Sequence, residues 1–270
     1  MKKITLLVLM LFSALSYAQV GINIATPHTS SALDVTSTSA GFLPPRMTAL
    51  QRAEIVNPAL GLMVFCTNCA SGDGELQVYY VSGWKNAAGG DITDPPQIGD
   101  YIDGGIVFYI ASPPADLDGD GDLDTGLVCA IQDQNSGIEW ILGGNTQTTT
   151  NGGTSASIGQ GQTNTTAMMG QAGYTGGAAK VCNDYSITVN EITYSDWFLP
   201  SKDELNQMYQ NRETINTTAA ANSGSNSFDY SYWSSTEYDF EYAWKQYFII
   251  SSPAYVYKVN SNSVRAVRAF

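Results

Sequence analysis

The segment DWFLPSKDELNQMY, residues 196–209, constrains the local fold more tightly than any other part of this chain. Its apolar run at residues 197–199 predicts a short buried strand, and Pro200 ends that strand because proline cannot donate to a strand ladder. Ser201 and Glu204 then have the spacing of a capping box, in which each side chain accepts a hydrogen bond from the other residue's backbone amide. The apolar stripe of the helix that follows is Leu205, Met208 and Tyr209.

The composition limits the classes of protein to which the chain can belong. Its 270 residues are enough for two ordinary domains, and 43% of them are hydrophobic, which allows a packed core. Only 14% are charged, and uncharged polar residues and glycine take their place, as is typical of secreted β-rich proteins. The formal net charge is -13, so phosphate backbones and anionic lipid surfaces repel the protein. We therefore expect no nucleic-acid partner and no binding to an anionic membrane surface.

The N-terminus has the three parts of a bacterial export signal. Lys2 and Lys3 give a positive start, an apolar run follows, and Ser16-Tyr17-Ala18 is a small-residue cleavage site. The apolar run is too short to remain as a membrane-spanning helix, and no later stretch is apolar enough to span a bilayer. Gln19 stands where a lipoprotein anchor would need cysteine. We expect residues 1–18 to be removed as a signal peptide and the protein to be secreted or displayed at a bacterial cell surface.

Export to an oxidising compartment makes the four cysteines candidates for disulfides. Cys66 and Cys69 form a C-x-x-C pair, but Cys66 ends an apolar run that predicts a strand, whereas a redox-active pair needs a helix N-terminus to lower the thiol pKa. A zinc site would need two further ligands, and the single histidine, His28, is badly placed to supply one. We predict two structural disulfides, Cys66–Cys69 and Cys129–Cys182.

Changes in composition divide the chain into two modules. Residues 19–88 predict a small β-rich module with short strands and a helix of residues 49–55 that Thr48 caps. Small residues followed by a stiff Pro-Pro pair predict a linker at residues 89–97. The second module, residues 98–270, contains the strand-to-helix segment described above.

An aspartate-rich loop, DLDGDGDLD, lies between two predicted strands of the second module. Alternate aspartates on a glycine-containing loop can direct their oxygens at one hard cation, as the first half of an EF-hand loop does. Leu127 occupies the position of the last EF-hand ligand, so the loop is not an EF-hand. Two interpretations stay open: an acidic, solvated hairpin tip, or a structural Ca2+ site, which is favoured because crowded carboxylates repel one another without a counter-ion. The candidate ligands are Asp116, Asp118, Asp120, Asp122 and Asp124.

The C-terminal stretch, Tyr230–Phe270, is dense in aromatic residues interleaved with Ser, Asn, Asp and Glu. Tyrosine and tryptophan give large, rigid contact areas and serine and asparagine add adaptable hydrogen bonds, a composition common in binding surfaces. The alternative is a set of aromatic strands buried in a core. A binding surface requires Phe240, Tyr242, Tyr255 and Tyr257 to share one exposed face. The candidate ligand-binding residues are Tyr238, Asp239, Phe240, Glu241, Tyr242, Trp244, Tyr247, Ile249, Tyr255, Tyr257, Asn260 and Asn262.

The first module contains the sequences GFLPPRMTALQRAEIVNPALGLMVF and LQVYYVSGWKN. They resemble a segment that recurs in surface proteins of Bacteroidetes and in phage tail-fibre-like proteins. The resemblance implies an attachment or stalk role, often as a trimer. A homotrimer would bury more surface than so small a module buries alone. A monomeric spacer is the alternative.

Several sequences of the second module occur in a fixed order: GGIVFYI, GLVCAI, DWFLPSKDELNQMY, YWSSTE and VRAVR. Together they resemble the Lcl C-terminal domain family, also met as a major paralogous domain of Bacteroidetes and Fibrobacter surface proteins. The resemblance implies an α+β, C-type-lectin-like fold with short strands, two helices and long loops. It also implies an adhesin or ligand-binding module rather than an enzyme.

The C-terminal stretch also resembles the variable region of proteins diversified by retroelements, which use a C-type-lectin-like fold. Those regions have a fixed WSSTEY-like start and a fixed VRAVR-like end, as residues 233–238 and 264–268 do here. The resemblance implies that the residues between Tyr238 and Asn262 are genetically diversified.

Three functional interpretations follow. The favoured one is a secreted or cell-surface adhesin that binds an extracellular protein or glycan through its aromatic C-terminal strands and loops. The second is a purely structural surface or fibre component with buried aromatics, in which Arg265 or Arg268 pairs inward with a carboxylate such as Asp196. The third, an enzyme of the formylglycine-generating or hydrolase type, is disfavoured because the second module has no histidine and no G-x-S-x-G motif.

Overall fold

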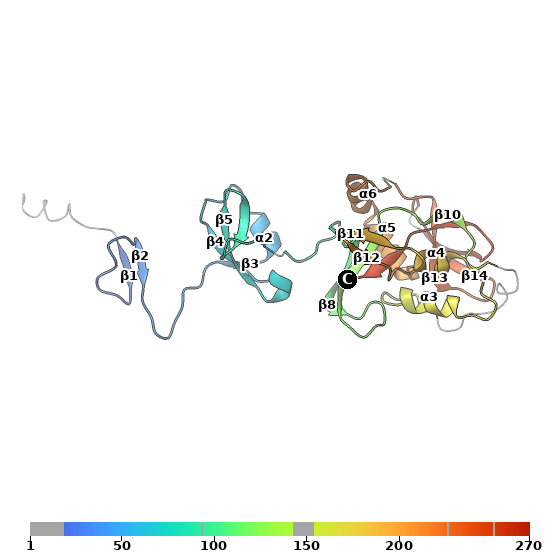
Figure 1. The fold of residues 1–270 in the computed structure, drawn as a ribbon, viewed down its shortest axis with the longest axis horizontal. Coiled ribbons are helices and arrows are strands. Elements are labelled where there is room, and N and C mark those ends of the chain that lie inside the picture. Colours follow the sequence, from blue (N-terminus) through green and yellow to red (C-terminus); the bar gives the residue numbers. More distant parts are fainter. Residues whose placement is uncertain (1–18, 93, 143–153, 226, 251) are drawn as a thin grey trace, which may run out of the picture. The chain divides into compact units, whose positions relative to one another are not determined.

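The computed structural model describes residues 19–92, 94–142, 154–225, 227–250 and 252–270. The predicted signal peptide, residues 1–18, lies outside the described residues. The chain divides into two compact units, one ending at Pro95 and the other running from Pro96 to Phe270. Figure 1 shows the strands and helices of each unit. Within the described residues, no helix is long and apolar enough to cross a membrane.

The first unit contains two sheets. β1 (Val20–Ile22) and β2 (Leu33–Val35) pair in parallel and form a two-stranded sheet. The other sheet has four strands: β3 (Arg46–Met47), β4 (Met63–Cys66), β5 (Glu75–Tyr80) and β6 (Gly83–Asn86). They lie in the order β3-β4-β5-β6, and a short 3-10 helix, η2 (Ala70–Gly72), connects β4 to β5. The predicted β-rich character of this region is confirmed.

Helix α2 (Ala49–Ala53) begins where the sequence predicts. The Thr48 hydroxyl accepts a hydrogen bond from the Gln51 amide at 3.2 Å, and the Gln51 side chain accepts one from the Thr48 amide at 2.9 Å. These two bonds make a capping box, which satisfies amides that have no partner inside the helix. The helix ends before the predicted residue 55, because the Ile55 amide bonds to the Arg52 carbonyl in a tighter turn.

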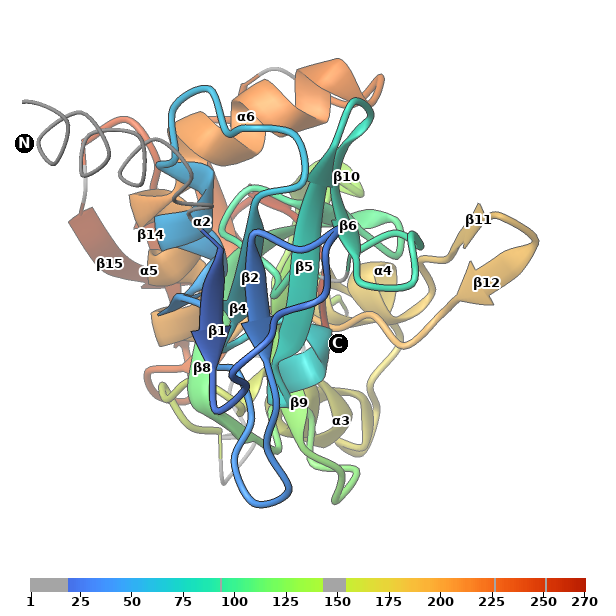
Figure 2. The same ribbon diagram turned by 90° about the vertical axis from the view of Figure 1, so that its left-hand side faces the viewer.

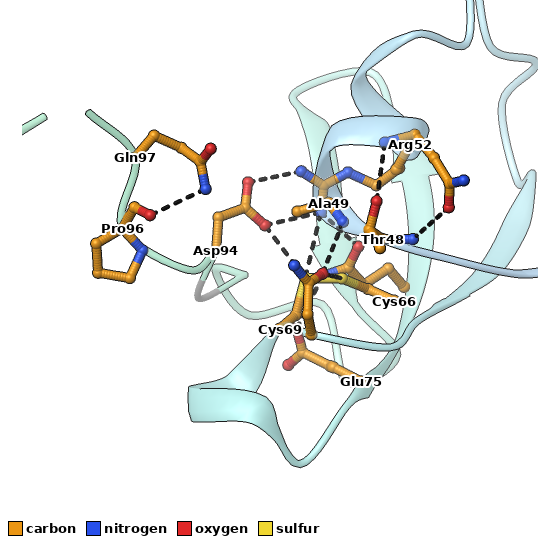
Figure 3. Close-up of polar contacts among 12 residues, drawn as sticks. Thr48, Ala49, Arg52, Cys66, Cys69, Glu75, Asp94, Pro96 and Gln97 are labelled. Carbon is orange, nitrogen blue, oxygen red and sulfur yellow. Dashed lines mark hydrogen bonds and ion pairs between the residues drawn. A yellow bond between two sulfur atoms is a disulfide. The ribbon is translucent and has the colours of Figure 1, made fainter. Parts of the chain in front are cut away.

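A polar cluster beside a disulfide holds the end of the first unit against α2 (Figure 3). Cys66 and Cys69 form the disulfide that the sequence predicts. The Arg52 side chain, only 5% exposed, donates from its two terminal nitrogens to both carboxylate oxygens of Asp94, at 2.8 and 2.6 Å. Arg52 Nη1 also donates to Gln77 Oε1 at 2.6 Å. Such a two-pronged pair has a fixed geometry, so the chain is anchored to the first unit as far as Asp94.

The second unit contains most of the strands and the longer helices. Its strands are β7 (Tyr101–Ile102), β8 (Gly105–Ala115), β9 (Asp124–Ala130), β10 (Asn135–Ile138), β11 (Ile187–Val189), β12 (Ile192–Tyr194), β13 (Ser231–Glu237), β14 (Tyr242–Tyr247), β15 (Ser252–Tyr257), β16 (Asn262–Val264) and β17 (Val267–Ala269). One sheet has the order β17-β9-β8-β7, and a larger one has the order β10-β16-β13-β14-β15. β11 and β12 form a separate hairpin that projects from the unit in Figure 2.

Four helices cover these sheets: α3 (Gly161–Met169), α4 (Ala178–Asn183), α5 (Lys202–Gln210) and α6 (Arg212–Ala221). α3, α4 and α5 contact β13, and α5 and α6 contact β8. The buried strand predicted at residues 197–199 is present only as a single antiparallel bridge between Phe198 and Val267. The unit is therefore mostly β with some helices.

The predicted Cys129–Cys182 disulfide is wrong, because both cysteines are buried free thiols. Successive side chains of a strand point to opposite faces of the sheet. On β9, Cys129 therefore faces the apolar cluster that contains Leu205 and Met208, whereas its neighbour Val128 faces the cluster that contains Cys182. The pleat of β9 thus directs Cys129 away from the layer in which Cys182 lies.

The capping box predicted at α5 is confirmed and extends beyond its own helix. Glu204 Oε2 accepts from the Ser201 amide at 2.7 Å. Its other oxygen accepts from the amides of Gly159, Gln160 and Gly161 at 2.8, 3.2 and 3.2 Å. Burial raises the pKa of Glu204 to about 7, although the four amide donors act in the opposite direction. One buried carboxylate thus joins the start of α5 to the start of α3.

Candidate functional site

The β14–β15 hairpin carries the aromatic residues that the sequence singles out. Its antiparallel register sets Tyr242 opposite Tyr257 and Trp244 opposite Tyr255. Because side chains two residues apart share one face of a strand, these four rings lie on the same face of the sheet. Tyr238, in the segment that leads from β13 into the hairpin, adds a fifth ring to them.

We call these five residues, Tyr238, Tyr242, Trp244, Tyr255 and Tyr257, the aromatic ladder. The rings of Tyr238 and Tyr255 stack with centroids 3.9 Å apart and planes 2° apart, and those of Tyr242 and Tyr257 lie 4.4 Å apart. Trp244 meets Tyr238 and Tyr255 edge-on, with both centroids at 5.5 Å. Tyr238, Tyr255 and Tyr257 stay 48%, 47% and 49% exposed. The ladder is therefore an ordered, rigid surface that solvent reaches.

The hydroxyl groups of the ladder interact with one another. A hydrogen bond to Tyr257 raises the pKa of Tyr242 to about 12. Repulsion from Tyr255, together with a hydrogen bond between the two hydroxyls, raises the pKa of Tyr238. The phenols of Tyr238 and Tyr242 are therefore neutral at physiological pH, and the ladder presents hydroxyl groups along an apolar surface.

Sequence reasoning missed a buried ion pair between Lys258 and Glu237, the residues that flank the ladder segment in sequence. Lys258, 1% exposed, pairs with the Glu237 carboxylate, which is 4% exposed, and also donates to the Phe240 carbonyl at 3.1 Å. The Lys258 ammonium lies 4.9 Å from the Trp140 ring centroid. Lys258 directly follows the last residue of β15 and Glu237 is the last residue of β13. The pair therefore joins the two ends of the segment that carries the ladder. The sequence feature that could have indicated the pair is a single lysine at the end of an otherwise uncharged strand.

Five other predicted residues lie in turns that adjoin β14 and β15, namely Asp239, Phe240, Glu241, Ile249 and Asn260. Asp239 Oδ1 accepts from the backbone amides of Glu241 and Tyr242 at 2.8 and 2.9 Å, so this carboxylate shapes the turn. Phe240, 47% exposed, lies in that turn, whereas Ile249, 69% exposed, follows β14. The exposed Asn260 donates its backbone amide to the Tyr257 carbonyl.

The remaining predicted residues, Tyr247 and Asn262, do not belong to the ladder. Tyr247 packs edge-on against Tyr230, with centroids 5.0 Å apart, and against the ammonium of Lys245. Asn262 is 4% exposed, so it does not lie on the exposed surface that the ladder forms. Its Oδ1 accepts from Ser231 and Lys245, because the register of β16 turns this side chain inward.

Three of the five aspartates in the acidic loop come together. Carboxylate oxygens of Asp116, Asp118 and Asp120 lie within 4.8 Å of one another, a group that does not include Asp122 or Asp124. Burial first, and then repulsion from neighbouring aspartates, raises the pKa of Asp118. Oxygen donors at this spacing suit a hard cation such as Ca2+. The loop also lines a cavity of about 760 Å³ together with polar residues of α3.

The inward pairing predicted for one C-terminal arginine is confirmed. Arg268 Nε donates to both oxygens of Asp196, at 3.0 and 3.1 Å, and Arg265 Nε donates to Asp133 at 2.6 Å. Arg265 is fully buried, with its guanidinium carbon 3.9 Å from the Phe228 ring centroid. Both arginines therefore belong to the buried framework of the second unit.

Comparison with known protein families gives two matches. The model of the Lcl C-terminal domain matches residues 129–268. The model of a phage tail like trimerisation region matches residues 21–98. No curated protein matches the chain. The two matches together indicate a surface or fibre-like protein.

Proposed function

Because the chain belongs to the Lcl C-terminal domain family, we propose that it is an exported surface protein that binds an extracellular protein or glycan through its aromatic ladder. The family match covers the ladder and its supporting residues. The observation that carries the proposal is that the ladder is ordered and about half exposed at Tyr238, Tyr255 and Tyr257. Rigid, accessible tyrosines lose little conformational entropy when they bind a partner.

We propose further that the first unit assembles the protein as a homotrimer. The family match to a trimerisation region covers this unit. All four apolar residues at the ends of β1 and β2 are exposed, namely Val20, Ile22, Leu33 and Val35. A two-stranded sheet is marginal in water unless its apolar residues are covered. Copies of the same chain would cover them, and would present several ladders to one partner.

Two further features of the proposal concern the second unit. The family resemblance supports a C-type-lectin-like arrangement, in which loops and terminal strands carry the ligand. The carboxylates of Asp116, Asp118 and Asp120 support a structural Ca2+ site. Each accepts hydrogen bonds from backbone amides and still has lone pairs that could bind an ion. The ion would rigidify the loop and take no part in chemistry.

The ladder proposal is tested by presenting the mature protein to arrays of extracellular proteins and glycans. The variant Tyr255→Ser/Tyr257→Ser removes two exposed rings of the ladder, and Tyr80→Ser removes a comparably exposed tyrosine of the first unit. We expect the ladder variant to lose at least about tenfold in affinity, the loss typical of a binding hot spot, and the control to bind as the parent does. Unchanged binding by the ladder variant would overturn the proposal.

A purely structural fibre component is the second candidate, favoured by the match to a trimerisation region. A structural fibre component should assemble, but no protein or glycan on the arrays should bind it in a way that Tyr255→Ser/Tyr257→Ser weakens. The same experiment therefore separates the two candidates.

A further inference from the structure

β15 is the edge strand of the larger sheet of the second unit. The sheet has the order β10-β16-β13-β14-β15, so β15 pairs with β14 on one side, and no other described strand pairs with it. We propose that this free edge binds an extended, positively charged peptide segment of a partner protein, which adds to the sheet as a further strand. The inference rests on the proposal that the aromatic ladder is a binding surface and deepens it, since Tyr255 and Tyr257 belong to both β15 and the ladder.

The pairing of β15 with β14 shows which backbone groups point toward the free edge. In an antiparallel pair, residues that exchange backbone hydrogen bonds alternate with residues whose amides and carbonyls point outward. The Lys258 amide donates to the Glu241 carbonyl at 2.9 Å, so these two residues form a hydrogen-bonded pair. The next pair along the register, Tyr242 with Tyr257, therefore points outward. The Tyr242 carbonyl accordingly accepts from the Tyr238 amide, on the side of β14 away from β15.

Tyr255 and Tyr257 therefore offer backbone groups to a new strand. By the same alternation, the backbone groups of Pro253 and Tyr255 also point outward, and proline suits such a position because it has no amide hydrogen to donate. The Tyr255 and Tyr257 amides are thus outward donors, and the Tyr255 carbonyl is an acceptor between them. The Tyr257 carbonyl already accepts from the Asn260 amide, so the edge ends there. Two donors and an acceptor at strand spacing match the backbone of one extended peptide.

The side chains of β15 leave this edge open. The strand, Ser252–Tyr257, carries no charge, although charged side chains on an edge strand are a common means of preventing strand addition. Pro253 removes only the first outward amide. Ile249, in the turn before the strand, and Val259, after it, are both exposed, so apolar side chains lie at both ends of the edge.

The charges near the ladder favour a basic peptide. The pKa of Tyr242 is raised chiefly by its hydrogen bond to a neighbouring tyrosine, and the charges of Glu241 and Asp239 add to this effect, so both carboxylates act on the ladder. Aromatic ring faces attract cations, and the Lys202 ammonium already lies 4.5 Å from the centroid of the Trp244 ring. Alternate side chains of an added strand would share the face of the ladder, where lysine or arginine would meet both rings and carboxylates. A second copy of the chain is disfavoured at this edge, because its own carboxylates would add to the negative charge.

The inference is tested by amide hydrogen exchange, followed by NMR on the isotope-labelled mature protein. The probe is the capped peptide acetyl-Lys-Val-Arg-Val-Lys-Val-amide, and the control probe has Glu, Asp and Glu in place of the three basic residues. We expect the basic probe to slow exchange of the Tyr255 and Tyr257 amides saturably, with a Kd of about 1 mM, as a few hydrogen bonds allow. The acidic probe should bind at least about tenfold more weakly.

Two variants separate the backbone from the rings. Tyr255→Ser and Tyr255→Pro both remove one ring of the ladder, but only the proline variant also removes an outward amide. Pro253 shows that β15 accepts proline at such a position, so both variants should fold, and comparison of their melting temperatures checks this. We expect Tyr255→Pro to bind the basic probe about tenfold more weakly than Tyr255→Ser, because one backbone hydrogen bond is lost and its acceptor is left unpaired.

The inference fails if the basic probe, at about ten times the expected Kd, leaves the exchange of both amides unchanged. It also fails if Tyr255→Pro and Tyr255→Ser bind the probe equally, or if the acidic probe binds as well as the basic one. Protection of the two amides that rises with protein concentration and needs no probe would show that a second copy covers the edge, and would overturn the proposed partner. Each of these results leaves the ladder proposal standing, because the array experiment measures what the ring side chains contribute.

Discussion

The Glu204 carboxylate accepts a 2.8 Å hydrogen bond from the backbone amide of Gly159, a residue that lies 45 positions earlier in the chain. The same carboxylate completes the capping box with Ser201. It therefore caps its own helix and at the same time fixes the turn that starts α3. A Cβ at Gly161 would lie 2.3 Å from Glu204 Oε2, so the turn also depends on glycine there.

Glu204 should make stability depend on pH. The pKa of Glu204 is raised from 4.5 to about 7, so the folded protein holds this proton more tightly than the unfolded chain does. The resulting stabilisation of the fold is fully present below about pH 4.5 and is lost as the pH rises through about 7. Relative to Glu204→Gln, which does not titrate, the parent should gain about 1 to 3 kcal/mol of unfolding free energy as the pH falls from about 8 to about 5. Urea unfolding at several pH values measures this difference. Asp203→Asn is the control in the same helical turn, and a pH-independent difference between parent and Glu204→Gln would contradict the prediction.

Two thiols should be free and unreactive in the folded protein. Burial raises the pKa of Cys129 to about 12, and burial likewise raises that of Cys182. Iodoacetamide at about pH 8 should leave the native protein unlabelled, because both thiols are protonated and inaccessible. After denaturation without reductant, mass spectrometry should find labels on Cys129 and Cys182 alone. Labels on none of the cysteines would instead support the Cys129–Cys182 disulfide.

Removal of Lys258 should destabilise the second unit strongly. Lys258→Met leaves the Glu237 carboxylate buried beside an apolar side chain, and breaking a buried pair in this way costs about 3 to 5 kcal/mol. Lys258→Met/Glu237→Gln should recover part of that loss, since no buried charge remains. Lys180→Met is the control, because the ion pair between Lys180 and Asp184 is about half exposed. Its loss should lower the free energy of unfolding by less than about 1 kcal/mol. Equal effects of the two lysine variants in denaturant titrations would refute the argument.

Removal of calcium should lower the melting temperature. If an ion neutralises Asp116, Asp118 and Asp120, its loss restores their repulsion. A change of about 1 to 2 kcal/mol corresponds to several degrees in a domain of this size. Calorimetry with and without EDTA measures the shift, and Asp118→Asn/Asp120→Asn should reduce it. A melting temperature that EDTA leaves unchanged would exclude the ion.

Charged residues on β1 and β2 should dissociate the proposed trimer. Ile22 and Val35 are 52% and 40% exposed, and three copies would bury them against one another. Ile22→Asp/Val35→Asp places carboxylates in that interface, where like charges repel. Light scattering should give a trimer for the parent and a monomer for the variant. Val259→Asp, in the second unit, should stay trimeric, and a monomeric parent would exclude the assembly.

Local signals were enough to predict several parts of the structure. The spacing of Ser201 and Glu204 predicted the capping box, and Thr48 predicted the start of α2. The Cys66–Cys69 disulfide was predicted because the C-x-x-C pair follows a strand rather than starting a helix and the sequence offers no further zinc ligands beside it. These features depend on hydrogen bonds and geometry within a few residues, which the sequence contains in full.

Contacts between residues far apart in the chain could not be predicted reliably from the sequence. Cys129 and Cys182 were predicted to pair because they were the remaining cysteines, but sequence order does not reveal which face of β9 each one meets. Asn262 looked like an exposed polar residue of the C-terminal stretch, yet the register of β16 turns it inward toward Lys245. Nothing in the spacing of Lys258 and Glu237 indicated that they form a buried pair.

The sequence by itself determined that the C-terminal stretch is aromatic, that α5 begins at a capping box and that the two parts of the chain resemble two known families. Only the tertiary structure decided which aromatic rings face solvent together. The reason is that β14 and β15 alternate their side chains between two faces, and the pairing register selects Tyr242, Trp244, Tyr255 and Tyr257 for one of them. Register depends on long-range packing, which no single stretch of the chain encodes.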